Sequence, residues 1–142
     1  KRSSHITNTG RLEAQSGSIE IAADFVALGG TLSASGQTGG AVDIKAQQVS
    51  LAENIEARGS AGAGGTVTIH TTSGALETSS SRIDVSGSTG GGSITHTSGG
   101  TILSSGTYVA NSSAGKGGNI DISARESTGL LRTTLEANGA AG

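Results

Sequence analysis

Acidic side chains recur at matched positions along the chain and are the first candidates for chemistry. When the repeating units of the sequence are aligned, Glu20 and Asp43 fall in one outward column and Glu56 and Asp84 in another, each pair one unit apart. Paired carboxylates about 5 Å apart can serve glycoside hydrolysis or raise one another's pKa. The two columns are Glu20, Asp43, Thr68, Thr95 and Asp121, and Glu13, Ser33, Glu56, Asp84, Ala110 and Glu136.

The surroundings of these carboxylates favour a solvated charge ladder over a catalytic site. The sequence contains one Tyr, one Phe and no Trp, so no aromatic platform can hold a sugar, and no long loop could build a cleft. Lys45 and Arg58 occupy neighbouring outward positions and can compensate part of the charge. We therefore expect no catalytic residue and no enzyme activity. Weak cation binding and polysaccharide cleavage are the alternative interpretations.

The histidines do not form a metal-binding pattern. In the aligned units His70 falls outward, whereas His96 falls inward in place of an isoleucine. Metal ligands must converge, and neither histidine has a carboxylate partner at a suitable spacing. We expect no metal and no cofactor. His96 is expected to be a local defect of the core, either hydrogen-bonded inside or displaced by a bulge.

Other motifs also favour structural roles. The Gly-Lys-Gly at 115–117 lacks the spacing of a phosphate-binding loop, so the glycines are interpreted as corners. Thr66, Thr68, Thr95 and Thr97 suggest a flat hydroxyl array, but the array stops after two units, which argues against ice binding. The sequon that begins at Asn111 is interpreted as an ordinary corner.

Composition excludes several classes of protein. Leu, Ile, Val and Phe make up roughly a fifth of the 142 residues, too few for a broad globular core but enough for a thin one. A net charge of −2 gives no electrostatic footprint for nucleic acid or an anionic membrane, and no apolar run is long enough to span a bilayer. The absence of Cys excludes disulfides and thiolate metal sites.

A repeat of about 25 residues organises the whole chain. A glycine-rich step precedes two β-branched residues that flank one polar residue, as in Val67-Thr68-Ile69, and successive instances begin 23, 25, 27 and 26 residues apart. A second motif, as in Ile83-Asp84-Val85-Ser86-Gly87, has an aliphatic, a polar, a small and a polar residue before Gly. A degenerate fifth copy of this second motif is predicted to begin at Val109. The first motif starts at Ile19, Val42, Val67, Ile94 and Ile120.

These patterns predict an all-β fold, a right-handed parallel β-helix or β-solenoid. Each unit contains three short alternating segments, which indicate three strands with one buried face, and glycine at the junctions would supply the positive φ of sharp corners. We expect about five coils of about 25 residues in a single segment spanning 1–142. A partial coil at 1–16 precedes coils that start near 17, 40, 65, 92 and 118.

The phrases at 62–69, 82–87 and 115–124 resemble the shaft repeats of filamentous-haemagglutinin-type exoproteins, the adhesins exported by two-partner secretion in Gram-negative bacteria. The resemblance covers about residues 12–142. It implies a stretch of shaft without the secretion domain, whose Asn-Pro motifs are missing from this proline-free chain. It also implies an extracellular or cell-surface location and a host or surface receptor bound elsewhere in a longer parent protein.

The function expected from the sequence is therefore structural. We expect a non-catalytic shaft segment of a secreted fibre, whose partners are neighbouring repeats or stacked copies of itself. The two terminal coils carry no obvious cap, so the isolated chain is expected to fray or to stack at its ends. The alternatives are a carbohydrate-active or carbohydrate-binding β-helix and a subunit of an end-to-end filament.

Overall fold

The computed structural model describes residues 4–52 and 54–140, and no helix occurs in these ranges. The strands form two parallel sheets. The first sheet contains β3 (Ser18–Ala22), β6 (Ala41–Ala46), β9 (Thr66–Thr71), β11 (Ser93–Ser98) and β13 (Asn119–Ala124). The second contains β1 (His5–Asn8), β2 (Arg11–Glu13), β4 (Phe25–Leu28), β5 (Thr31–Ser33), β7 (Gln48–Leu51), β8 (Asn54–Glu56), β10 (Leu76–Asp84), β12 (Thr101–Val109), β14 (Ser127–Leu130) and β15 (Thr134–Glu136).

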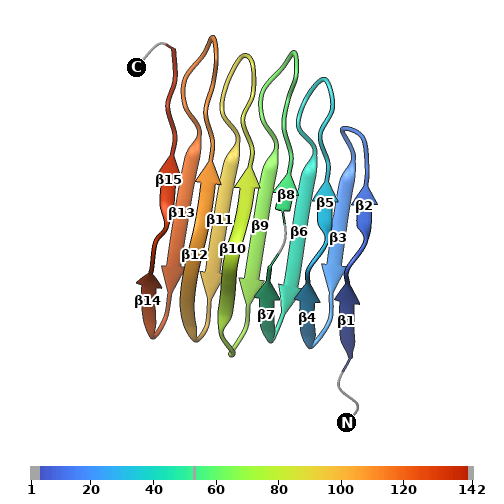
Figure 1. The fold of residues 1–142 in the computed structure, drawn as a ribbon, viewed down its shortest axis with the longest axis vertical. Helices are drawn as coiled ribbons and strands as arrows, with labels where there is room; N and C mark the ends of the chain where they lie inside the picture. Colours follow the sequence, from blue (N-terminus) through green and yellow to red (C-terminus); the bar gives the residue numbers. More distant parts are fainter. Residues whose placement is uncertain (1–3, 53, 141–142) are drawn as a thin grey trace.

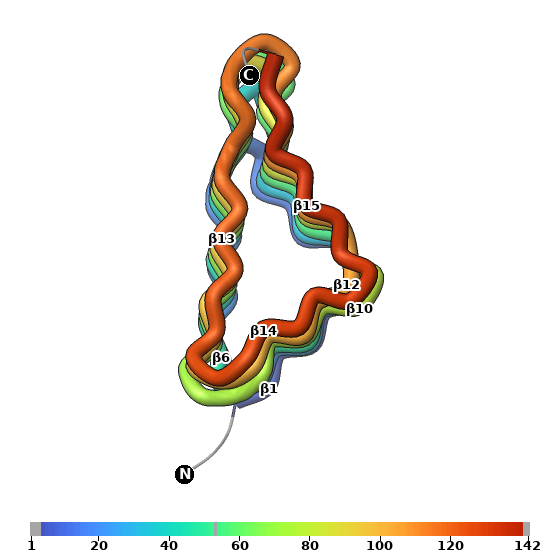
Figure 2. Tube along the Cα trace, turned by 90° about the vertical axis from the view of Figure 1, so that its left-hand side faces the viewer, coloured from blue at the N-terminus to red at the C-terminus, as the bar shows by residue number. Residues whose placement is uncertain are grey.

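The strands stack as a right-handed β-solenoid, as predicted. Successive coils lie side by side along one axis, with the N-terminal coil at one end and the C-terminal coil at the other (Figure 1). Viewed from the C-terminal end, the chain passes from β13 through β14 to β15 counterclockwise as it advances toward the viewer (Figure 2). The cross-section is a long triangle. Its narrow end is here called the tip and consists of residues 34–40, 57–65, 85–92 and 110–118.

The register of the first sheet confirms the alignment of the repeat. Ile19, Val42, Val67, Ile94 and Ile120 pair in sequence along the axis, so the spacings of the motif are the lengths of the coils. Alternate residues of each strand in this sheet point inward, because side chains in a β-strand alternate between its two faces. They are buried in β6, β9 and β11 and only partly buried in β13.

The number of strands per coil differs from the prediction in two coils. The second and third strands are separate in the coils that contain β4 and β5, β7 and β8, and β14 and β15, but they merge into the nine-residue strands β10 and β12. The register between these two strands shifts at Ser79/Ser81. Ser80, the residue between them, has a φ of 52°, which marks a bulge where β10 bends.

The core consists of columns of mainly aliphatic residues that run along the axis. One column holds Leu32, Ile55 and Ile83, each 0% exposed, and continues into Tyr108. The degenerate copy of the second motif therefore begins at Tyr108, one residue earlier than predicted. The chain thus fills its thin interior with few large side chains, because each one packs on its equivalents in the coils above and below.

Glycine pairs shape the tip by allowing close approach of two backbones, and the predicted role as positive-φ corners is wrong. None of the tip glycines has a positive φ. A Cβ on Gly65 would lie 1.9 Å from the carbonyl oxygen of Gly40 in the preceding coil, and one on Gly64 would lie 1.7 Å from that of Val85 in the next. The backbone N–H of Gly65 also donates across the tip to the carbonyl of Ala57 at 2.7 Å. Each pair thus closes the narrow end of its coil.

Candidate functional site

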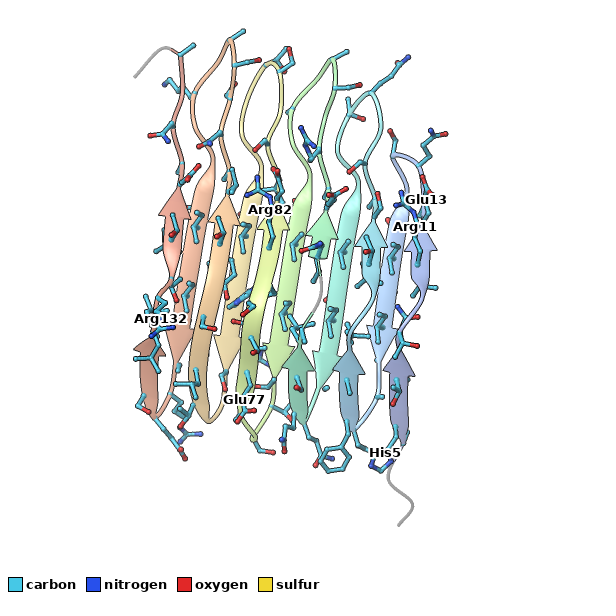
Figure 3. The ribbon with its side chains drawn as sticks, in the orientation of Figure 1. His5, Arg11, Glu13, Glu77, Arg82 and Arg132 are labelled. Atoms are coloured by element: carbon cyan, nitrogen blue, oxygen red, sulfur yellow. The ribbon has the colours of Figure 1, made fainter. Side chains whose placement is uncertain are left out.

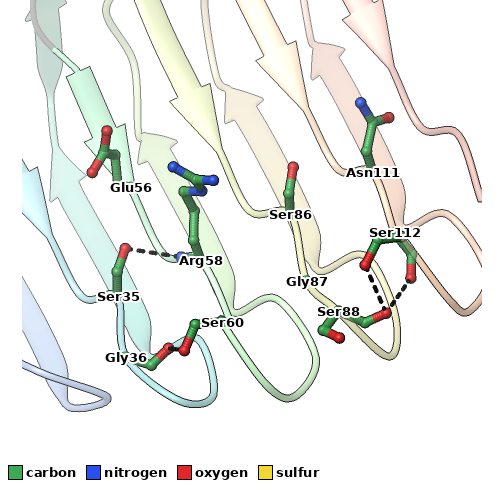
Figure 4. Close-up of a pocket in the computed structure, with 12 residues that line it drawn as sticks. Ser35, Gly36, Glu56, Arg58, Ser60, Ser86, Gly87, Ser88, Asn111 and Ser112 are labelled. Carbon is green, nitrogen blue, oxygen red and sulfur yellow. Dashed lines mark hydrogen bonds between the residues drawn. The ribbon is translucent and has the colours of Figure 1, made fainter.

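A polar groove lies beside the third strand of each coil, between that strand and the tip (Figure 4). It consists of two adjoining hollows of about 720 and 850 Å³ that share Ser35, Gly36, Glu56 and Ser60. Arg11 and Glu13 lie at its N-terminal end (Figure 3). Because both hollows are open and their lining is largely hydroxyl, amide and charged, the groove is a candidate surface for a polar, extended ligand.

One of the two predicted acidic columns runs along the groove, which Glu13, Ser33 and Glu56 line, and its register needs one correction. Glu13, Ser33, Glu56 and Asp84 pair in sequence as predicted, but the next position is Val109, which pairs with Glu136. Ala110, the residue expected there, lies in the inward column of small residues and is 0% exposed.

Two polar residues of this column are less solvated than predicted. Ser33 and Asp84 are 3% and 4% exposed, although the strand alternation places them on the outer face. The backbone trace bends inward between the third strand and the tip (Figure 2), and Arg58 and Arg82 lie against the carboxylate of Asp84. Asp84 thus behaves as a buried charge, and a buried carboxylate needs partners.

Asp84 has those partners. One oxygen of its carboxylate, Oδ2, lies 3.0 Å from Nη2 of Arg82 and 3.7 Å from Nε of Arg58, and the other, Oδ1, accepts the backbone N–H of Ser86 at 2.9 Å. Burial alone would raise the pKa of Asp84, but the hydrogen bonds of Ser86 and Arg82 and the charge of Arg58 outweigh it and hold the pKa below its ordinary 3.8. Asp84 is therefore ionised near neutral pH and cannot act there as a general acid.

The chemistry available in the groove follows from this arrangement. Glu56 and Asp84 are neighbours in register, but the charge of Asp84 is already neutralised by Arg58 and Arg82. A glycosidase needs one carboxyl group that holds its proton near neutral pH, and Asp84 does not supply it. What the groove offers instead is a row of hydrogen-bonding groups from Ser35, Arg58, Ser86 and Asn111, one from each coil.

The other acidic column lies on the outer face of the first sheet, in the predicted register. Glu20, Asp43, Thr68, Thr95 and Asp121 pair one after another. Lys45 compensates part of this charge, as expected, since its Nζ lies 3.1 Å from Oδ2 of Asp43. The face is a flat sheet surface.

The histidines lie where the alignment placed them. His70 is on the outer face, next in register to Lys45 and Thr97, and His96 points into the core with 0% exposure. The pairing of β11 continues through His96 without a bulge, and neither of its ring nitrogens has a hydrogen-bond partner among the described residues. The expected internal hydrogen bond is therefore wrong. Within 4–52 and 54–140, no three His, Cys, Asp or Glu side chains gather as a metal site would require.

The remaining motifs lie in structural positions. Thr68 and Thr95 pair in register on the first sheet, between Asp43 on one side and Asp121 on the other. Thr66 pairs with Ser93, and Thr97 pairs with His70. In the sequon, Asn111 donates from Nδ2 to Glu136 at 3.1 Å and accepts the backbone N–H of Asn138 at 2.7 Å, which ties two coils together.

Sequence reasoning missed a buried polar cluster formed by Thr78, Ser104 and Tyr108. The hydroxyl of Tyr108 lies 2.5 Å from that of Ser104 and 3.0 Å from that of Thr78. Two signals in the aligned units could have found it. Tyr108 stands in a column of aliphatic residues, and Thr78 and Ser104 replace leucine in the column of Leu28 and Leu51.

Comparisons of the chain with protein-family models, with curated proteins and with solved structures found no match. No helix of the described part of the chain is long and apolar enough to cross a membrane.

Proposed function

We propose that this chain is a non-catalytic, load-bearing segment of a secreted or cell-surface fibre, of the filamentous-haemagglutinin shaft type. The observation that carries the proposal is the uninterrupted parallel register, in which each coil from β3 to β13 is hydrogen-bonded to the next along one axis. Tension applied along this axis loads many backbone hydrogen bonds together, as a rod that holds a binding region away from a cell requires.

The state of the acidic residues also supports a non-catalytic role. Asp84 is ionised and paired with Arg82, and Asp43 is paired with Lys45. The outward polar side chains keep a rod soluble without forming a reaction centre. The partners in this proposal are neighbouring repeats of a longer chain or stacked copies, and any receptor is bound elsewhere in the parent protein.

Two measurements test the proposal. Antibodies against the segment should label intact source cells or the culture medium, and protease added to intact cells should remove the signal. Incubation with polygalacturonate, alginate, chitin or glucan should release no sugar and no unsaturated product. Turnover that disappears in Glu56→Gln or Asp84→Asn, with the folding of the variant unchanged, would overturn the structural role.

A second candidate function, glycan binding, is favoured by the groove alone. Its row of hydroxyl, amide and guanidinium groups spans several coils and faces solvent, an arrangement that suits an extended sugar chain. Isothermal titration with neutral and acidic oligosaccharides tests this candidate. Binding that is lost in Arg58→Ala and retained in Arg125→Ala would support it, because Arg125 lies outside the groove. Equal titration curves for both variants would remove it.

A further inference from the structure

The core of the solenoid is interrupted by polar side chains where β10, β11 and β12 meet. His96 is fully buried in a column whose other members, Ile21, Ile44, Ile69 and Ile122, are apolar. Its ring meets the ring of Tyr108 edge-on, with centroids 5.1 Å apart. Since neither ring nitrogen is hydrogen-bonded to a described residue, the imidazole contributes packing but leaves its polar atoms unsatisfied.

The hydroxyl groups nearby are already committed to one another. Thr78 and Ser104 bond at 2.9 Å, and both contact the hydroxyl of Tyr108. The larger Tyr108 side chain is accommodated because Thr78 and Ser104 are smaller than the leucines of the same column. We call His96, Tyr108, Thr78 and Ser104 the polar joint.

No charged side chain faces His96. The inward residues next to His96 are Ile69 of β9, Ile122 of β13 and Tyr108 of β12, and only Tyr108 can titrate. The other ionisable residues of these strands and of β10 lie at alternate, outward positions and are His70, Glu77, Arg82, Asp84 and Asp121. A proton on His96 would therefore meet no counter-charge in the core.

We propose that the polar joint is an acid-sensitive point of the rod, at which protonation of His96 opens β11 and β12 locally while the coils of β3 to β8 stay folded. The opening is local because each solenoid coil is stabilised mainly by its immediate neighbours. The cores of those earlier coils contain Val42, Ile44, Val49, Leu51 and Ile55, none of which titrates.

The direction and size of the effect follow from linkage. Desolvation lowers the pKa of His96 from 6.5 to about 4 in the folded state. The open state binds a proton more readily, so the closed state is fully favoured above pH 6.5 and loses stability as the pH falls toward 4. The His96 pKa thus differs by about 2.5 between the open and the closed state. This difference raises the equilibrium constant for opening by about 300-fold at pH values well below 4, and by about 30-fold between pH 7.5 and pH 5.0.

Hydrogen exchange of the full chain, followed by mass spectrometry and corrected for intrinsic exchange rates, tests the proposal. Between pH 7.5 and pH 5.0 the opening constant of peptides from β11 and β12 should rise about 30-fold more in the unaltered chain than in His96→Ile. Isoleucine matches the rest of the column, so this variant should fold. The control variant His70→Asn removes an imidazole from the outer face and should behave as the unaltered chain does.

Three results would overturn the proposal. The first is an equal pH dependence in the unaltered chain and in His96→Ile. The second is an acid-induced rise of the same size in β6 and β7, since opening would then be global. The third is that the His96 imidazole of the folded, unaltered chain titrates near its ordinary pKa of 6.5 in nuclear magnetic resonance spectra. This measurement does not depend on the folding of the variant.

Discussion

At the scale of single residues, strand alternation sets the direction in which a side chain points, and the surrounding surface sets its solvent exposure. The alternation Val67-Thr68-Ile69 predicts which residues face the core, and Val67 and Ile69 are 0% exposed. The same rule places Asp84 outside, yet it is buried where the backbone bends inward and two arginines lie against its carboxylate. This bend depends on how the third strand meets the tip, and no local sequence pattern encodes that shape.

The in-and-out alternation can be tested with two neighbouring substitutions. Ile69→Asp should lower the free energy of unfolding by several kcal/mol, because it places an unpaired carboxylate in a dry column. Thr68→Asp should change it by less than about 1 kcal/mol, because Thr68 lies on the outer face. Thermal and urea unfolding measure both. Equal damage by the two substitutions would show that the register is wrong.

Asp84 and Asp43 form a matched pair for a test of a buried and a more exposed ion pair. Asp84→Asn should lower the free energy of unfolding at pH 7 by about 1–2 kcal/mol, because Arg82 and Arg58 lose a buried partner. Asp43→Asn should have an effect below about 1 kcal/mol, because the side chains of Lys45 and Asp43 are 56% and 34% exposed and solvent screens their attraction.

The pH dependence of Asp84→Asn tests the buried ion pairs of Asp84. The folded-state pKa of Asp84 lies below 3.8, so the stability that it contributes is present above pH 3.8 and disappears as the pH falls further. The difference between Asp84→Asn and the unaltered chain should therefore shrink in urea titrations below pH 3.8. A difference that stays constant to pH 2 would contradict the ion pairs seen here.

At the scale of elements, the positions of the strands were predictable and the reason for the glycines was not. The motif spacing predicted the paired residues of the first sheet, because a parallel solenoid repeats its register in every coil. The motif spacing could not predict the conformation of the Gly-Gly steps, because Gly occurs both where the backbone has a positive φ and where two backbones pack closely. The structure shows that Gly65 is needed for backbone contact with Gly40.

Two glycine-to-alanine substitutions distinguish these roles. Gly65→Ala should lower the free energy of unfolding by more than about 3 kcal/mol or prevent folding, because its Cβ would lie 1.9 Å from a backbone oxygen that cannot move alone. Gly29→Ala should change stability by about 1 kcal/mol or less, because nothing lies within 4 Å of its Cβ. Circular dichroism melts would decide, and a neutral Gly65→Ala would refute the tip packing.

At the scale of the whole molecule, stacked coils make each residue's stability depend on its position along the axis. Ile55 and Ile83 in the central coils are 0% exposed, whereas Leu12 and Leu135 of the same column are 40% and 48% exposed in the outermost described coils. The repeat in the sequence predicts one column, and only its stacking in space distinguishes the middle from the ends. Tyr108 could have been assigned to this column from the aligned repeat, but its partners Thr78 and Ser104 come from a different column, that of Leu28 and Leu51.

In the isolated 142-residue chain, the outermost coils are therefore expected to be the least stable and the most prone to self-association. Amides of β13, β14 and β15 should exchange with solvent faster than those of β9, because β13 to β15 have one stacked neighbour where β9 has two. The sedimentation coefficient should rise with protein concentration as exposed columns cover one another. Leu135→Lys should suppress this association, whereas Leu103→Lys, on the outer face of β12, should leave it unchanged. A concentration-independent monomer whose β13 to β15 amides are as protected as those of β9 would show that the ends need no neighbour.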